Sequence, residues 1–230
     1  MRRDSPEVVA LEETRYALPA PAAEVVAAFD PFVTDERKAR IEAVLAHRTR
    51  AVIPVLERLS DPHNAAAILR SCDAFGAQEA HVIDEQARFV ASSRVAKGAE
   101  RWLDLVRHDS TRNCLEGLRA RGYRVLVASM EGEHTPEQLS SIERVALVFG
   151  NEHHGVSPEM RALADGSYRI PMRGFVESLN VSVAAAITLH AALLGRKQPI
   201  DAEDAMQLRA RFYVQTVDRG QEILRNLFPR

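Results

Sequence analysis

The first segment whose residues could do chemistry is DPHNAAAILR at residues 61–70, where Asn64 and Arg70 flank an apolar stretch. An arginine beside an apolar face is often a surface residue whose alkyl chain covers that face. It can also grip a phosphate or stabilise a forming oxyanion, because its guanidinium is a permanent cation with five N–H donors. The segment alone leaves both interpretations open.

A second candidate is FGNEHHGVS at residues 149–157, where Glu152 lies in a loop between Gly150 and Gly155. Two glycines permit positive φ angles and a close approach of the backbone to a ligand. A plain turn between a strand and a helix would carry the same residues. This motif indicates a binding loop only in combination with others.

The third candidate is IPMRGFVESLNVSVAAAI at residues 170–187, where Ser178 and Asn180 lead into a helix. The first turn of a helix has free N–H groups that can receive an anion or a ligand edge. Ser178 could also be a simple N-cap. A cap would not explain why 181–194 has no Asp, Glu, Lys or Arg, which is typical of a buried helix or a subunit interface.

Few residues suggest a metal or a disulfide. His153 and His154 adjoin Glu152, but neighbouring residues point in different directions and no third ligand has suitable spacing, so we expect no metal. A metal-dependent hydrolase built on these residues stays an alternative. Cys72 and Cys114 are 42 positions apart, which indicates free thiols in a reducing compartment. With no apolar run of 18 residues, we expect a cytoplasmic protein without a membrane partner.

The elements that must position these segments alternate between strands and helices. This alternation predicts an α/β fold with a mostly parallel sheet and helices on both faces. Ligands in such folds bind beyond the carboxyl ends of the strands. Strands are expected at 51–56, 79–83, 102–106, 123–129, 145–150 and 167–172, and helices after Asp61, Asp109 and Ser157, at 179–194 and at 201–226.

The residues before the first strand form two regions. Residues 1–34 are rich in Ala and Pro and predict an extended or mobile arm, and Thr34 caps a helix over 35–50. The net charge of the chain is −2, yet 37–50 holds five basic residues and one acid. This helix is either a solvated surface or an RNA-contacting element. Its candidate RNA contacts are Arg37, Lys38, Arg40, Arg48 and Arg50.

Together the three motifs resemble the SpoU/TrmH family of the SPOUT superfamily, in the order and spacing that this family shows, over residues 37–195. The resemblance implies a SPOUT methyltransferase domain at 51–195 with a C-terminal deep trefoil knot, followed by a helical extension at 196–230. It also implies a homodimer with its active site at the interface. S-adenosylmethionine would be held, as methyl donor, near Ala128, Ser129, Phe149, Gly150, Tyr168, Ile170, Met172, Ser178 and Leu179.

The resemblance also implies catalytic roles. Arg70 matches the catalytic arginine of the family, and Asn64, Glu152, Ser178 and Asn180 match its supporting polar residues. Arg70 would remove the proton of a ribose hydroxyl with the help of an RNA phosphate. It would equally well stabilise the forming alkoxide, because arginine stays protonated in proteins. Glu152 is then a proton acceptor or a residue that orients Arg70 and Asn64.

The short extensions around the domain resemble those of family members that act on tRNA. We therefore expect 2′-O-methylation of tRNA, at guanosine 18 of the D-loop. Methylation of ribosomal RNA or of another tRNA position is the alternative within the class. A non-catalytic RNA-binding protein is the alternative outside it, and the intact Asn64, Arg70, Glu152 and Asn180 argue against that.

Overall fold

The computed structural model describes residues 8–10, 17–84, 90–92, 98–196 and 198–229. The chain forms two compact units. The larger one comprises 1–15 and 50–197, and the smaller one comprises 16–49 and 198–230.

The larger unit is built on a six-stranded parallel sheet with the strand order β5-β3-β2-β7-β6-β8. This confirms the predicted fold class. A separate antiparallel pair joins β1 (Val8–Ala10) and β4 (Val90–Ser92). The strands of the large sheet are β2 (Val52–Glu57), β3 (Glu79–Ile83), β5 (Asp104–His108), β6 (Arg124–Ala128), β7 (Val145–Phe149) and β8 (Gly166–Tyr168).

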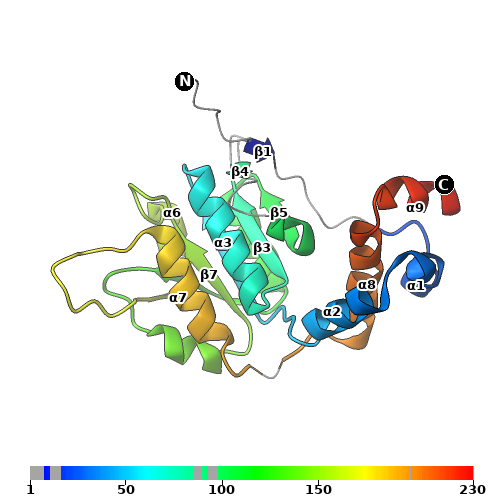
Figure 1. Cartoon of the computed structure of the whole chain (residues 1–230). Helices are drawn as coiled ribbons and strands as arrows, with labels where there is room; N and C mark the ends of the chain where they lie inside the picture. Colours follow the sequence, from blue (N-terminus) through cyan, green and yellow to red (C-terminus); the bar gives the residue numbers. More distant parts are fainter. Residues whose placement is uncertain (1–7, 11–16, 85–89, 93–97, 197, 230) are drawn as a thin grey trace, which may run out of the picture. The chain divides into compact units, whose positions relative to one another are not determined.

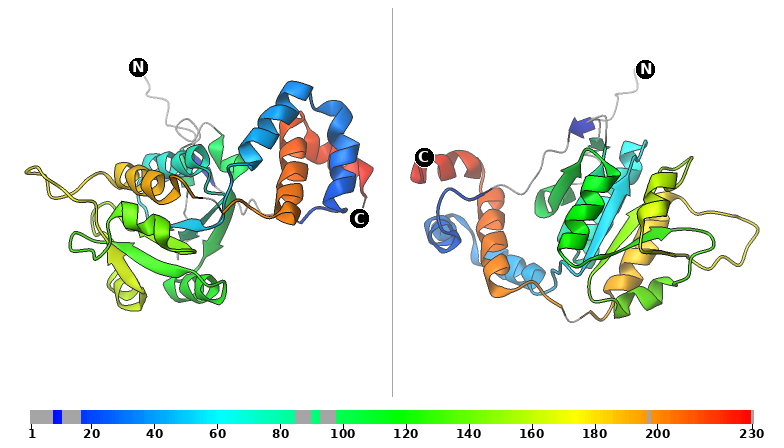
Figure 2. Two further views of the ribbon diagram at one scale, coloured as in Figure 1. Left: turned by 90° about the horizontal axis from the view of Figure 1, so that it is seen from below. Right: turned by 180° about the vertical axis from the view of Figure 1, so that it is seen from behind.

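Helices cover both faces of the sheet. On one face α3 (Pro62–Phe75) and α7 (Val181–Leu193) lie side by side in Figure 1 and share a core that includes Leu69 and Leu189. On the other face α5 (Thr111–Ala120) and α6 (Pro158–Leu163) pack over a second core, and the view from behind in Figure 2 has the green α5 on the near side. The strands β2, β3 and β7 between them are therefore buried along their whole length.

The ends of these helices follow their capping residues. Asp61 caps α3 by accepting a hydrogen bond from the His63 N–H at 2.8 Å, and α3 ends at Gly76, whose φ is 89°. Ser157 caps α6, as the sequence predicts. The expected cap of α5 is wrong, because Ser110 rather than Asp109 caps this helix. Asn180 caps α7, so Ser178 is not the simple N-cap that the sequence left open as an alternative.

Three short 3₁₀ helices complete the connections: η1 (Asp30–Phe32), η2 (Ala99–Trp102) and η3 (Pro136–Ser141). The turn of η2 ends at Trp102, so β5 begins two residues later than the expected 102–106. The strand expected at 167–172 is shorter in the structure, where β8 ends at Tyr168 and the next residues are irregular.

In the middle of the sheet, the connections that follow two neighbouring strands lead to opposite faces. Strands β2 and β7 are hydrogen-bonded neighbours. The chain leaves β2 for α3 on one face, and it leaves β7 for α6 on the opposite face. The carboxyl ends of two such strands enclose a crevice, which is the usual ligand site of an open parallel sheet.

Arg196, three residues after the end of α7, ties that helix to the segment before β7. The Arg196 guanidinium donates to the carbonyl oxygens of Leu139, Ile142 and Glu143 at 2.9, 2.7 and 3.0 Å. These bonds bring two segments together that are more than 50 positions apart. The trefoil knot implied by the family resemblance would involve this segment and stays a prediction.

In its described residues the smaller unit contains η1 and four α-helices: α1 (Ala22–Phe29), α2 (Asp35–Leu45), α8 (Ala202–Thr216) and α9 (Gly220–Leu227). The expectation of an extended arm is wrong for α1, which buries Val25 and Phe29 and packs against α8. The expected single tail helix is interrupted near Arg219, which has a left-handed φ of 52°. Among the described helices, none has the length and apolar character needed to span a membrane.

Candidate active site

The Glu152 carboxylate is the centre of a hydrogen-bond network at the crevice between β2 and β7. Its Oε2 accepts from the Ser60 N–H at 3.0 Å and from the Ser60 hydroxyl at 2.8 Å. Its Oε1 accepts from the Asp61 N–H at 3.1 Å and from Asn64 Nδ2 at 3.0 Å. One carboxylate thus fixes the loop after β2 and the first turn of α3.

The network continues through Asn64 to the start of α7. Asn64 Oδ1 accepts from Asn180 Nδ2 at 3.1 Å. Asn180 Oδ1 in turn accepts from the Ser182 N–H at 2.8 Å and the Ser182 hydroxyl at 2.6 Å. The structure therefore brings three predicted site residues, Asn64, Glu152 and Asn180, into one continuous chain of side chains.

The electrostatics of Glu152 favour a fixed negative charge. Burial works against ionisation, but the hydrogen bonds from Ser60 and Asn64 outweigh it and lower the pKa of Glu152 to about 2. A carboxylate with this pKa that already accepts four hydrogen bonds is a weak proton acceptor near neutral pH. Of the two roles open from the sequence, the geometry favours orientation of Asn64.

The loop that carries Glu152 depends on close backbone contact. A Cβ added to Gly150 would lie 2.3 Å from the carbonyl carbon of Gly155, so only glycine fits. Asn151 Nδ2 donates to the Arg58 carbonyl at 2.8 Å and ties this loop to the end of β2. The sequence analysis did not select Asn151 or Ser60, although a polar residue directly after a predicted strand is a usable signal.

Two predicted catalytic residues stand apart from this network. Arg70 is exposed on α3 and makes no hydrogen bond or ion pair with the part of the chain that the structure describes. Ser178 is exposed as well, in the run 171–178 that extends away from the sheet as the yellow loop of Figure 1. Their guanidinium and hydroxyl groups are therefore available to a ligand or another chain.

The predicted binding residues for the methyl donor fall into two groups. Ala128, Ser129, Phe149, Gly150 and Tyr168 lie at the carboxyl ends of three neighbouring strands, β7, β6 and β8. The Ser129 N–H donates to the Tyr168 carbonyl at 2.9 Å. Phe149 and Tyr168 are core side chains in edge-to-face contact, with centroids 6.3 Å apart, so only their backbone groups face a ligand.

The second group lies in or beside the exposed loop. Ile170 and Leu179 are half-buried, whereas Met172 and Ser178 are exposed, and the structure does not bring these last two to the strand ends. One neighbouring residue was missed by the sequence analysis. A Cβ on Gly132 would lie 2.1 Å from the carbonyl carbon of Tyr168, so the loop after β6 passes directly over the end of β8.

Two of the five expected RNA contacts are wrong for this conformation. Arg48 is 1% exposed. Arg50 is bound to the buried carboxylates of Glu79 at 2.8 Å and Asp104 at 2.5 Å. A basic residue that neutralises buried acids is not available to phosphates.

The other three expected contacts lie on α2. Arg37 and Arg40 are exposed. Lys38 is half-buried and forms an ion pair with Asp30 at 2.7 Å. The positive charge open to solvent on α2 therefore comes mainly from Arg37 and Arg40.

At the carboxyl ends of β2 and β7 a polar network joins the Glu152 loop, the first turn of α3 and the start of α7. This is the place where open parallel α/β sheets of enzymes bind their ligands. The chain matches the model of the SpoU rRNA Methylase family over residues 51–190, and it belongs to that family. This confirms the family predicted from the three motifs.

Curated relatives extend the match beyond the domain. A tRNA (guanosine(18)-2′-O)-methyltransferase of Borreliella burgdorferi is 34% identical over 198 residues, which cover 84% of this chain and 91% of the relative. The protein of the same name from Thermus thermophilus is 39% identical and covers 69% of this chain and 82% of its own length.

Solved structures confirm the fold. The A. aeolicus TrmH/SpoU tRNA modifying enzyme superposes with a TM-score of 0.70 at 28% identity, covering 80% of this chain and 98% of the other. AviRb from Streptomyces viridochromogenes, solved in complex with AdoMet, has a TM-score of 0.55 at 29% identity, covering 64% of this chain and 58% of the other.

Proposed function

We propose that this protein transfers the methyl group of S-adenosylmethionine to the 2′-hydroxyl of guanosine 18 in tRNA. The observation that carries the proposal is the hydrogen-bond chain Glu152–Asn64–Asn180, which joins the loop after β7, the first turn of α3 and the start of α7. Two relatives that align with most of the chain bear the name of this activity. A structural neighbour was solved with AdoMet, which supports the choice of methyl donor.

The strand ends of β6, β7 and β8 suit this donor. Ala128, Ser129 and Gly150 have uncharged side chains, and they lie at the carboxyl ends of the neighbouring strands β6 and β7. Backbone carbonyl oxygens carry a partial negative charge, so they can lie beside the cationic sulfonium without forming an ion pair with it. S-adenosylmethionine, when bound, supplies an electrophilic methyl group, and the loops around it would hold the acceptor ribose in line, which can contribute about 7–11 kcal/mol to the rate.

Within this proposal Arg70 and Glu152 have separate tasks. Arg70 grips the phosphate beside the target ribose and stabilises the alkoxide that forms as the hydroxyl proton leaves. Its exposed position, with no hydrogen bond or ion pair to the residues that the structure describes, supports this task. Glu152 keeps Asn64 in one orientation, with its Nδ2 toward Glu152 and its Oδ1 toward Asn180.

The proposal includes a homodimer whose interface contains α7. One side of α7 packs on the sheet through Ala185, Leu189 and Ala192, while Val183 and Ile187 on another side remain 46% and 41% exposed. An uncharged helix with exposed branched apolar residues favours burial against a second copy. Light scattering of the purified chain should give twice the monomer mass, and a concentration-independent monomer would contradict this part.

The names of the curated relatives support tRNA as the substrate, and Arg37 and Arg40 offer exposed charge for its backbone. We also propose a cytoplasmic location, where tRNA is found and where the two cysteines would stay reduced.

The test of the function is methyl transfer from labelled S-adenosylmethionine to a tRNA transcript by the intact protein, Arg70→Ala and Arg112→Ala. Arg112 is an exposed arginine on α5 and is the matched control. We expect label in tRNA with the intact protein and with Arg112→Ala. With Arg70→Ala we expect the rate of methyl transfer to fall at least about 100-fold, which is the usual effect of removing one group that stabilises transition-state charge. Absence of label with the intact protein would overturn the function, and near-normal turnover by Arg70→Ala would overturn the role of Arg70.

A further inference from the structure

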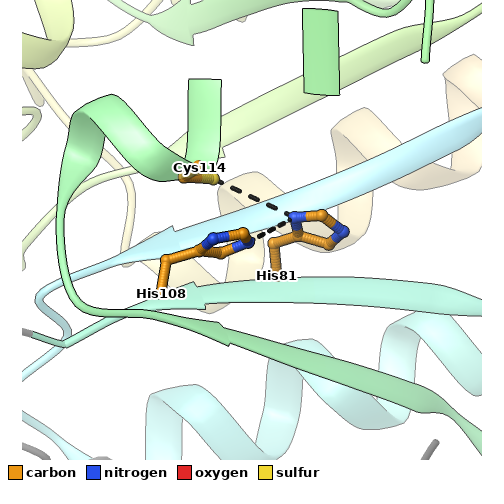
Figure 3. Close-up of side chains that lie close together, drawn as sticks. All are labelled: His81, His108 and Cys114. Carbon is orange, nitrogen blue, oxygen red and sulfur yellow. Dashed lines mark hydrogen bonds between the residues drawn. The ribbon is translucent and has the colours of Figure 1, made fainter. Parts of the chain in front are cut away.

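Three potential metal ligands come together away from the proposed active site. His108 Nε2 lies 2.9 Å from His81 Nδ1, and Cys114 Sγ lies 3.9 Å from the same nitrogen, as Figure 3 shows. One ligand atom from each residue falls within 4.8 Å of the other two. His81 and Cys114 are buried, and His108 is half-buried.

The fold aims these side chains at one point. Alternate residues of a strand face opposite sides, and on β3 Ala80 and Val82 belong to the α3 side while Ile83 packs on the α5 side. His81 therefore faces α5. Its neighbour in the sheet, β5, presents His108 beside Ile83 in register. Cys114 lies in the first turn of α5 and packs in the same core as Ile83.

A carboxylate fixes the orientation of His81. Glu79 Oε1 lies 2.7 Å from His81 Nε2, so this nitrogen carries the proton and His81 Nδ1 keeps its lone pair. Arg50 and Arg121 hold Glu79 in turn, with hydrogen bonds of 2.8 and 3.0 Å to its Oε2. A carboxylate behind a histidine is the usual outer layer of a protein metal site.

The spacing of the ligand atoms suits a tetrahedral ion. Metal bonds of about 2.0–2.1 Å to nitrogen and 2.3 Å to sulfur imply ligand separations of roughly 3.3–3.6 Å. The observed separations from His81 Nδ1, 2.9 Å to nitrogen and 3.9 Å to sulfur, lie on either side of this range. Shifts of a few tenths of an ångström would adjust both.

We propose that His81 Nδ1, His108 Nε2 and Cys114 Sγ bind a divalent transition-metal ion, with Zn²⁺ as the best match to two imidazoles and one thiolate. Binding releases the thiol proton of Cys114 to solvent, and His108 carries its remaining proton on Nδ1. Burial and the nearby Glu57 raise the pKa of Cys114 to about 12, so it remains a thiol until a cation arrives. Water can complete the coordination from the half-buried His108 side.

This ion would have a structural role. The ligands belong to the core under α5, whereas Asn64 lies on α3, which packs on the opposite face of the sheet. An ion at this point would clamp β3, β5 and α5 together. The site lies outside the proposed methyl-transfer machinery, so its test needs no activity assay.

The test uses the full chain, freed of metal and titrated with Co²⁺ and Zn²⁺, beside the matched variants Cys114→Ala and Cys72→Ala. Both cysteines are fully buried, but only Cys114 is a proposed ligand. We expect a thiolate-to-cobalt absorption band and tetrahedral visible bands in the intact chain and in Cys72→Ala, and neither in Cys114→Ala. Zn²⁺ should raise the Tm of the intact chain and be retained stoichiometrically through dialysis.

A second variant, His108→Ala, changes the half-buried ligand and should weaken Zn²⁺ retention at least tenfold, with His153→Ala, an exposed histidine, as its control. Should Cys114→Ala fail to fold, the cobalt spectrum of the intact chain decides. Absence of a thiolate-to-cobalt band there, or equal Zn²⁺ retention by the intact chain and His108→Ala, would overturn the proposal.

Discussion

Glu152 and Asn64 are 88 positions apart in the sequence, and their side chains meet in a hydrogen bond of 3.0 Å between Glu152 Oε1 and Asn64 Nδ2. The contact joins the loop after β7 to the first turn of α3, the helix that follows β2. Since Asn64 also accepts from Asn180, one carboxylate determines which way the Asn64 amide faces. The proposed chemistry depends on this orientation.

Replacing the Glu152 carboxylate by an amide should weaken the hydrogen-bond network while some of its bonds remain. In Glu152→Gln one accepting oxygen becomes a donor that faces the N–H groups of Ser60 and Asp61 or the amide of Asn64. A lost charge-assisted bond at this partly exposed site costs about 1–2 kcal/mol, so we expect roughly a tenfold drop in kcat/KM. Single-turnover methyl transfer measures it, and an unchanged rate would remove Glu152 from the account.

The same residue predicts a dependence of stability on acid. The folded-state pKa of Glu152, about 2, lies below its ordinary value of 4.5. The stabilisation is therefore fully present above pH 4.5 and is lost as the pH falls from 4.5 toward 2. Denaturant unfolding over this pH range should show a shallower loss in Glu152→Gln than in the intact chain. Parallel curves for the two proteins would contradict the assignment.

Asn180 has two functions that two variants separate. Its Oδ1 caps α7, and its Nδ2 donates to Asn64. Asn180→Asp keeps the cap and loses the donor, so stability should be nearly unchanged while methyl transfer falls. Asn180→Ala loses both and should also unfold more easily by about 1 kcal/mol. If both variants kept full activity, Asn180 would be only a cap.

Gly150 should not tolerate a side chain. The added Cβ of Gly150→Ala would lie 2.3 Å from backbone atoms of Gly155 and Val156, which are unable to yield as a flexible side chain would. We expect a loss of about 1–3 kcal/mol or more in the free energy of unfolding. The control is Gly117→Ala in α5, where nothing lies within 4 Å of the new atom and a gain of about 0.5–1 kcal/mol is expected. Thermal unfolding compares them, and equal effects would refute the steric argument.

Exposed charge on α2 should govern the salt dependence of tRNA binding. Arg37→Ala and Arg40→Ala should each lower the slope of log affinity against log salt by about 0.7–0.9 if the residue contacts one phosphate. Arg112→Ala on α5 should leave the slope unchanged. Filter binding at several salt concentrations measures this. Slopes equal to that of the intact chain would return α2 to a plain solvated surface.

Local sequence signals predicted local structure well. Thr34, Asp61 and Ser157 cap helices as expected, because a cap needs only the residue and its next three neighbours. The prediction that Arg50 contacts RNA was wrong, because its partners Glu79 and Asp104 are 29 and 54 positions away in the sequence. Only the folded sheet brings these carboxylates to Arg50.

Contacts between residues that are distant in the sequence also explain why the histidine cluster and the helix α1 were not predicted. His81, His108 and Cys114 have no regular spacing, and only the register of β3 and β5 brings the two histidines together. The arm helix α1 was missed because its stability comes from packing on α8, nearly 180 residues later in the chain. The family motifs identified Asn64, Glu152 and Asn180, while their mutual bonds required the fold.

The most direct measurement of the central claim is methyl transfer to two synthetic tRNAs that differ by one oxygen. One carries guanosine at position 18, the position in the names of the relatives, and the other carries 2′-deoxyguanosine there. We expect label from S-adenosylmethionine in the first tRNA, mapped to that ribose, and none in the second. Equal labelling of both tRNAs would contradict the claimed acceptor, and labelling of neither would contradict methyl transfer to tRNA.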